Sequence, residues 1–151
     1  MFRGTFEARI DSKGRVNVPV KFREVLKEIG DDRLFVTNLR VGDVHCLEAR
    51  PYPEWLKLEA RIAERRDLSL AAIAFYDNFY LPGAQECAID KLGRLLVPPT
   101  LRKYADLSDD IVFTGARGKF RVWDLHNWHP VHSAAEQIGV SDPGVMSELG
   151  L

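Results

Sequence analysis

GTFEARIDSKGRVNVP, residues 4–19, returns in the same chain as GAQECAIDKLGRLLVP, residues 83–98. The two stretches align without a gap at a spacing of 79 residues. The identical pairs are Gly4 and Gly83, Glu7 and Glu86, Ile10 and Ile89, Asp11 and Asp90, Gly14 and Gly93, Arg15 and Arg94, Val18 and Val97, Pro19 and Pro98, and Arg23 and Arg102. A repeat of this extent predicts that the chain contains two copies of one module.

Each copy has the pattern of a strand, a tight turn, a second strand and a helix. Phe6, Ala8 and Ile10 alternate with polar residues, which is typical of a half-buried strand. Pro19 ends the second strand and can begin a helix, because a helix needs no N–H at its first position. Gly30 is a C-terminal stop for that helix.

The turn between the two strands is an Asp-x-x-Gly-Arg motif. The side chains of Asp11 and Asp90 can accept backbone N–H bonds across their turns. Gly14 and Gly93 can adopt the positive φ that closes such a turn. We therefore expect these four residues to have a structural role.

The rest of the chain predicts further strands around residues 34–37, 43–48, 111–114 and 120–123. Residues 53–80 predict one or two helices. The C-terminal tail predicts a short helix followed by a frayed end, with Pro130 interrupting any helix near it. The expected fold class is α+β, mainly β, with short helices.

Composition and charge place limits on the protein class. The chain of 151 residues is 46% hydrophobic and 28% charged, which is ordinary for a folded protein. Its net charge is −1, but residues 1–27 contain seven basic and three acidic side chains, and residues 82–103 contain four basic and two acidic ones. No apolar run is long enough to span a bilayer, and the first residues lack the apolar stretch of a signal peptide. We expect a cytoplasmic protein with no membrane partner, in which Cys46 and Cys87 are buried and reduced.

The paired basic turns favour binding to double-stranded DNA. The side chains of Arg15 and Arg94 are expected to project from the face of the hairpins opposite the buried valines and leucines. An arginine in such a position can bond guanine O6 and N7. The other candidate DNA-binding residues are Lys13 and Lys91 at the turn tips, and Arg3 and Arg9, which are either phosphate contacts or solvated charges. For a single copy of the motif, an arginine that bonds only its own aspartate would be the simpler interpretation.

The duplicated motif, each copy followed by an apolar strand and proline, resembles the MraZ family and, more distantly, the SpoVT/AbrB domains. The opening Met1-Phe2-Arg3-Gly4 and the segment Val18-Pro19-Val-Lys-Phe-Arg23 carry the same resemblance, which covers roughly residues 1–130. It implies a tandem duplicated AbrB-like swapped-hairpin β-barrel. The corresponding division is a first repeat at residues 1–52, a helical connector at 53–80, a second repeat at 81–130 and a tail at 131–151.

The resemblance also implies a function. MraZ proteins are bacterial transcriptional regulators that bind direct repeats in the promoter of their own cell-division and cell-wall operon, and they assemble into rings. This chain is accordingly expected to be a nucleoid-associated homo-oligomer, most simply a repressor. Three departures make the second copy less basic, because Arg3 corresponds to Pro82, Arg9 to Ala88, and Lys21 to Thr100.

Other functions have less support in the sequence. An oligomeric structural or scaffolding protein, whose motifs serve assembly alone, is the principal alternative. A small β-barrel hydrolase is a third, but the chain has no nucleophile elbow, P-loop or HExxH motif, so we expect no catalytic residue and no cofactor. His126, His129 and His132 invite a metal site, yet no nearby cysteine or acid completes one, and no metal is expected.

Overall fold

The structure, a computed structural model that describes all 151 residues, repeats one order of elements in its two halves. The first half contains β1 (Thr5–Arg9), β2 (Arg15–Asn17), α1 (Val20–Ile29), β3 (Arg33–Val41) and β4 (Val44–Pro51). The second contains β5 (Gln85–Ala88), β6 (Arg94–Leu96), α4 (Pro99–Tyr104), β7 (Asp110–Ala116) and β8 (Lys119–Asp124). The remaining elements are α2 (Tyr52–Glu64), α3 (Leu70–Phe75), the π-helix η1 (Tyr76–Tyr80), α5 (Leu125–Ser141) and α6 (Pro143–Glu148). The α+β class with short helices is confirmed.

The strands pair across the two halves rather than within each copy. A six-stranded antiparallel sheet has the order β1-β7-β8-β4-β3-β5, so β1 lies against the second half and β5 against the first. The strands β2 and β6 form a separate two-stranded antiparallel ribbon. Within the first copy only one bridge, Ile10 to Val16, joins the segments on either side of the turn.

The expected closed barrel is not formed. The large sheet ends at β1 on one side and at β5 on the other, and these two edge strands do not pair. Because β2 and β6 pair with each other, neither connects the edges of the large sheet. The prediction of a closed barrel was therefore wrong.

One apolar core is shared by the two halves. It contains 19 buried side chains from both copies. Phe22 of α1 lies at its centre, with its ring 5.2 Å from Phe2 and 5.1 Å from Phe120. Neither half could bury these rings without the other, so the duplication gives one cooperative unit.

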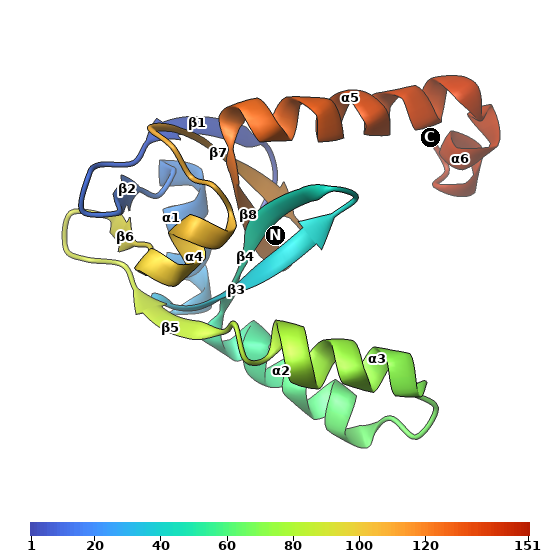
Figure 1. Cartoon of the computed structure of the whole chain (residues 1–151), viewed down its shortest axis with the longest axis horizontal. Coiled ribbons are helices and arrows are strands. Elements are labelled where there is room, and N and C mark those ends of the chain that lie inside the picture. The colour runs from blue at the N-terminus through green and yellow to red at the C-terminus, as the bar shows by residue number, and fades with distance from the viewer.

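Two helical arms extend from the β body (Figure 1). The helices α2 and α3 form one arm, and α5 and α6 form the other. The first arm is fixed to the sheet at Tyr80, whose hydroxyl donates to Glu48 at 2.8 Å and whose carbonyl accepts from Thr37 at 2.6 Å. One or two helices were predicted in residues 53–80, and the structure has α2 and α3 there, followed by η1.

The tail differs from the prediction. The helix α5 runs through Pro130 for 17 residues, and α6 follows where a frayed end was expected. The side chain of Asp124 caps the N-terminus by accepting from the backbone N–H of Asn127 at 3.1 Å. Trp128 and Val131, three residues apart, pack on the small core cluster around Trp123. This packing on both sides of Pro130 compensates for the single backbone hydrogen bond that a proline removes.

None of the helices combines the length and the apolar character needed to cross a membrane.

Candidate nucleic-acid interface

The first turn is held together by the carboxylate of Asp11. Its Oδ1 accepts from the backbone N–H groups of Lys13 at 3.0 Å and Arg15 at 2.9 Å. Its Oδ2 accepts from Nε of the Arg15 side chain at 2.8 Å. Gly14, at φ +85°, closes the turn by donating its N–H to the carbonyl of Asp11 at 3.0 Å. One carboxylate thus fixes both the turn and the direction of the arginine.

The second turn has the same geometry. Asp90 Oδ1 accepts from the N–H groups of Leu92 and Arg94, both at 2.9 Å, and Oδ2 accepts from Arg94 Nε at 2.9 Å. Gly93 has φ +79°. The backbone N–H of Arg15 is the main cause that lowers the pKa of Asp11, and that of Arg94 lowers the pKa of Asp90 in the same way. Both carboxylates are therefore charged at neutral pH and hold their arginines.

The ribbon formed by β2 and β6 has one buried and one open face. Val16 and Leu95 lie opposite each other and face the core, with exposed fractions of 1% and 0%. Arg15 pairs with Leu96, and Asn17 pairs with Arg94, so these four side chains share the open face. Arg15 and Arg94 occupy diagonal positions, which in an antiparallel pair are about 7–8 Å apart. The ribbon therefore brings together two arginines that are distant in sequence.

Each turn rests on the opposite half of the chain. Val18 donates its N–H to the carbonyl of Gly93 at 2.9 Å, and Val97 donates to that of Gly14 at 2.8 Å. A Cβ added to Gly14 would lie 2.6 Å from Nε of Arg102, and one added to Gly93 would lie 2.7 Å from Nη1 of Arg23.

The sequence repeat identified Arg23 and Arg102 without assigning them this supporting position. Both side chains pack against the turn of the opposite half, and Arg23 Nε also donates to the carbonyl of Val18 at 3.2 Å.

The other predicted DNA-binding residues lie on the turns, on β1 and near the N-terminus. Lys13 and Lys91 are exposed on the turns. Arg9 projects from β1 with 75% of its side chain exposed and lies 3.7 Å from both Asp109 and Asp110. Arg3 is exposed outside the ribbon and lines a hollow beside α1. The structure therefore groups the turn residues and places Arg3 apart from them.

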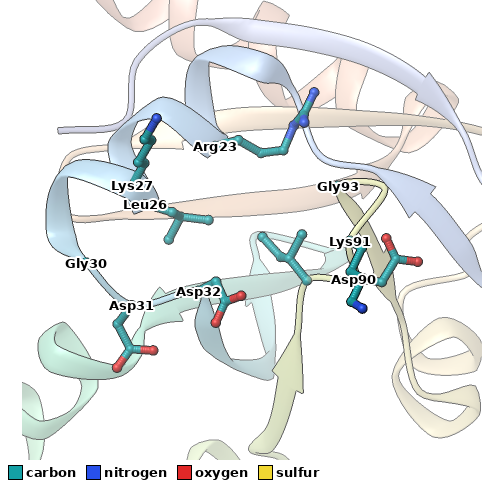
Figure 2. A pocket seen from close by; sticks show the side chains of 10 residues that line it. Arg23, Leu26, Lys27, Gly30, Asp31, Asp32, Asp90, Lys91 and Gly93 are labelled. Carbon is teal, nitrogen blue, oxygen red and sulfur yellow. The ribbon is translucent and has the colours of Figure 1, made fainter.

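A hollow of about 530 Å³ lies between the second turn and α1 (Figure 2). Its charged side chains are three basic and three acidic ones, namely Arg23, Lys27, Lys91, Asp31, Asp32 and Asp90. Because these charges balance, the hollow has no net positive charge that would attract a phosphate.

Two residues of the open face were not anticipated from the sequence. Asn17 and Leu96 lie beside the arginines, and Leu96 is 55% exposed. In an isolated strand, Leu95-Leu96 gives no indication of which leucine faces the core. Only the alignment of Leu95 with Val16 in the repeat pattern could have assigned Leu96 to the surface.

The arrangement leaves the outer part of each arginine free to bind. In both turns the aspartate bonds Nε and the backbone, and neither Nη of Arg15 or Arg94 has a partner within the protein. The side chains are 36% and 30% exposed. A guanidinium held at Nε presents its two Nη groups in a fixed direction, which reduces the entropy lost when they bind an acceptor.

The remaining reactive side chains have no site-like arrangement. Cys46 and Cys87 are buried as predicted, and burial raises the pKa of Cys46 to about 12 and that of Cys87 to about 11. His132 stacks on Trp128 with 4.8 Å between ring centroids. No group of three or more His, Cys, Asp or Glu side chains is arranged to hold a metal ion.

Comparisons with known proteins agree with the duplicated motif. The family model described as "MraZ protein, putative antitoxin-like" matches residues 1–74 and 80–143. A protein of Geotalea uraniireducens, named "Transcriptional regulator MraZ", is 44% identical over 160 residues. Proteins of the same name from Geobacter sulfurreducens and Halothermothrix orenii are 39% identical over 158 residues and 34% identical over 151 residues. In all three cases the match covers 100% of both chains.

Proposed function

This chain belongs to the MraZ family, and on that basis we propose that it is a transcriptional regulator that binds double-stranded DNA. Its target is a set of direct repeats in the promoter of its own cell-division and cell-wall operon, where it acts as a repressor. The regulatory role is supported by the name that its relatives share. It acts by binding alone, without catalysis or a cofactor.

The observation that carries the proposal is the open face of the ribbon. A two-stranded β-ribbon fits the major groove of B-DNA, and this one bears Arg15 and Arg94 on the face away from the core. Since each arginine is bonded to its aspartate through Nε, its Nη groups remain available for guanine O6 and N7. The guanidinium groups are thus oriented before DNA arrives.

The lysines supply contacts of a different kind. Lys13 and Lys91 lie at the turns, where flexible ammonium groups can approach phosphates on either side of the groove. Such contacts fix the register of the protein without reading sequence, and they make binding sensitive to salt. Arg9 is a further phosphate contact, because its ion pairs are exposed and their 3.7 Å separations exceed hydrogen-bond length. Arg3, which is exposed beside α1 and apart from the turn residues, is a phosphate contact as well.

We also propose that the two halves are swapped-hairpin modules, at residues 1–52 and 81–130, joined by the connector 53–80 and followed by the tail 131–151. The pairing of β1 with β7 and of β3 with β5 supports this division, since each half supplies an edge strand to the other. The reciprocal bonds between the turns and the opposite strands support it as well.

Several copies of the chain act together as a ring in the cytoplasm, associated with the nucleoid. Large apolar side chains on both arms support such assembly, since Leu70, Leu149 and Leu151 are 86%, 70% and 85% exposed. One ribbon makes few base contacts, so linking several ribbons on several DNA repeats multiplies the affinity.

A second candidate function is an oligomeric scaffold without specific DNA binding. The ion pairs between Arg15 and Asp11 and between Arg94 and Asp90 favour it, because they give both arginines a role within the turn. The free Nη groups favour DNA binding instead.

Footprinting of the DNA upstream of the gene separates the two functions. A regulator is expected to protect regularly spaced elements at physiological salt, and the protection should weaken steeply as salt rises. Absence of any protected element at low salt would leave the scaffold as the better account.

A further inference from the structure

The two ends of the ribbon are equivalent in backbone and different in side chains. The midpoint of the pair Val16–Leu95 relates Arg15 to Arg94 and Asn17 to Leu96. A surface groove flanks each end. The first groove, of about 730 Å³, lies beside Asn17 between β1 and the start of α1. The second groove, of about 480 Å³, lies beside Leu96 between β5 and the start of α4.

The grooves carry different charge at equivalent positions. Arg9 and Lys21 line the first groove. Their counterparts in the second half are Ala88, which lines the second groove, and Thr100, at the start of α4. The acids that face Arg9 are Asp109 and Asp110 at 3.7 Å.

Lys21 faces Glu24 at 3.6 Å. All of these pairs are exposed and longer than a hydrogen bond, so a phosphate can replace the acid as the partner of either base. The second groove has no basic side chain at these two positions, and the basic residues that line it are Lys13 and Arg102.

The open face of the ribbon is also unequal at its two ends. Asn17 offers amide donors and an acceptor, whereas its counterpart Leu96 offers an apolar surface. At the turn tips, Lys13 lies at the Leu96 end, whereas its counterpart Leu92, which is 69% exposed, lies at the Asn17 end. An asparagine can bond adenine N6 and N7, and an apolar side chain can contact the methyl group of thymine.

We propose that this inequality makes each chain a directional reader, which binds its DNA element in one orientation with the Arg9 and Lys21 groove always at the same end. The inference rests on the proposed DNA binding. A reader with identical ends would bind one element equally well in two orientations related by a half turn. A directional reader places successive chains of an assembly head to tail on direct repeats, and it would not do so on inverted ones.

The direction can be measured with a cleaving group attached to one turn. Ser12 is exposed at the tip of the first turn, at the Leu96 end of the ribbon, and is not among the DNA-binding candidates. The variant Ser12→Cys provides an accessible thiol for iron–EDTA, because the natural Cys46 and Cys87 are buried. The full-length labelled protein is bound to a duplex that carries one element found by footprinting, and strand cleavage is mapped.

Cleavage at one end of the element is expected to exceed that at the other end by roughly tenfold. This ratio corresponds to the loss of one good base contact when the chain binds in the reverse orientation. Equal cleavage at both ends would overturn the directional reading and leave the proposed DNA binding intact. Failure to protect any element would contradict the proposed function, and the directional reading with it.

An exchange of the groove residues tests which side chains set the direction. The labelled protein then also carries Arg9→Ala, Lys21→Thr, Asn17→Leu, Ala88→Arg, Thr100→Lys and Leu96→Asn. All six positions are exposed, so the fold should persist, and circular dichroism checks that it does. The main cleavage should move to the opposite end of the element. Cleavage that stays where it was, in a folded protein that still binds, would show that these residues do not orient the chain.

Discussion

At the scale of single residues, the central feature is the sharing of one aspartate between a turn and an arginine. Asp11 and Asp90 accept from two backbone N–H groups and from one arginine Nε each. The bond between arginine and aspartate was foreseen as an alternative to DNA binding. The geometry makes the two roles compatible, because the bond occupies Nε and leaves both Nη groups free.

Removal of one arginine should therefore reduce DNA binding without unfolding the protein. Arg15→Ala is expected to weaken specific binding by about 1–3 kcal/mol for each base contact that it makes. Fluorescence anisotropy with a labelled promoter duplex measures the effect. The control is Arg40→Ala, which removes an exposed arginine paired with Asp43 near the β3–β4 turn. Equal affinities for Arg15→Ala and Arg40→Ala would refute the assignment of Arg15.

The turn carboxylates should titrate in acid at an unusually low pH. Backbone and side-chain donors lower the pKa of Asp11 and Asp90 below their ordinary value of 3.8. As the pH falls below that value, the unfolded chain takes up these protons before the folded one, so both turns lose their contribution to stability. NMR titration of the carboxyl carbons is the direct measurement, with Asp11→Asn as a check on assignment. Midpoints at or above 3.8 would contradict the bonding described for these turns.

At the scale of elements, the sequence predicts the individual strands and helices better than it predicts which strands pair. Alternation predicted β1, and Gly30 marked the end of α1, because both signals lie within a few residues. The pairing of β1 with β7 joins residues about a hundred positions apart, and no local pattern encodes it. Pro130 was overridden by packing of the residues around it. For the site, the repeat revealed Arg15 and Arg94, and the ribbon register placed Asn17 and Leu96 beside them.

Because each turn packs against the opposite half of the chain, substitution by alanine should lower the stability by different amounts at two glycines. Gly14 and Gly30 have similar φ, +85° and +81°, but only Gly14 has atoms of the opposite half within contact distance. Gly30→Ala should cost about 1–2 kcal/mol for the left-handed backbone alone. Gly14→Ala should cost more, because its Cβ also displaces Arg102. Urea unfolding gives both values, and equal losses would argue against the packing of Arg102 under the turn.

At the scale of the whole molecule, we assign the proposed DNA binding to the ribbon and the proposed assembly to the two arms. The net charge is only −1, so the proposed affinity for DNA must come from the location of the basic residues and not from the total charge. The arms extend away from the β body (Figure 1). They expose apolar side chains such as those of Leu70 and Leu149. In the proposed assembly the ribbons contact DNA and the arms contact neighbouring chains.

Assembly through the arms should be sensitive to charge at an apolar position. Light scattering is expected to give a mass several times the 17.2 kDa of one chain. Leu70→Glu should lower that mass while the melting temperature of the chain changes little, since Leu70 is 86% exposed. Lys57→Glu, on the same arm but at a polar position, is the control. A monomer of the natural protein at micromolar concentration would exclude this assembly.

The claim that the ribbon reads promoter DNA is tested most directly by titration of the natural protein and of the Arg15→Ala, Arg94→Ala double variant on the upstream promoter fragment. A scrambled duplex of the same composition and two salt concentrations complete the experiment. The account predicts that the natural protein prefers the promoter, that its affinity falls steeply with salt, and that the double variant loses the preference for the promoter while it keeps weak, salt-sensitive binding through its lysines. A folded double variant that still prefers the promoter, or a natural protein that never does, would contradict it.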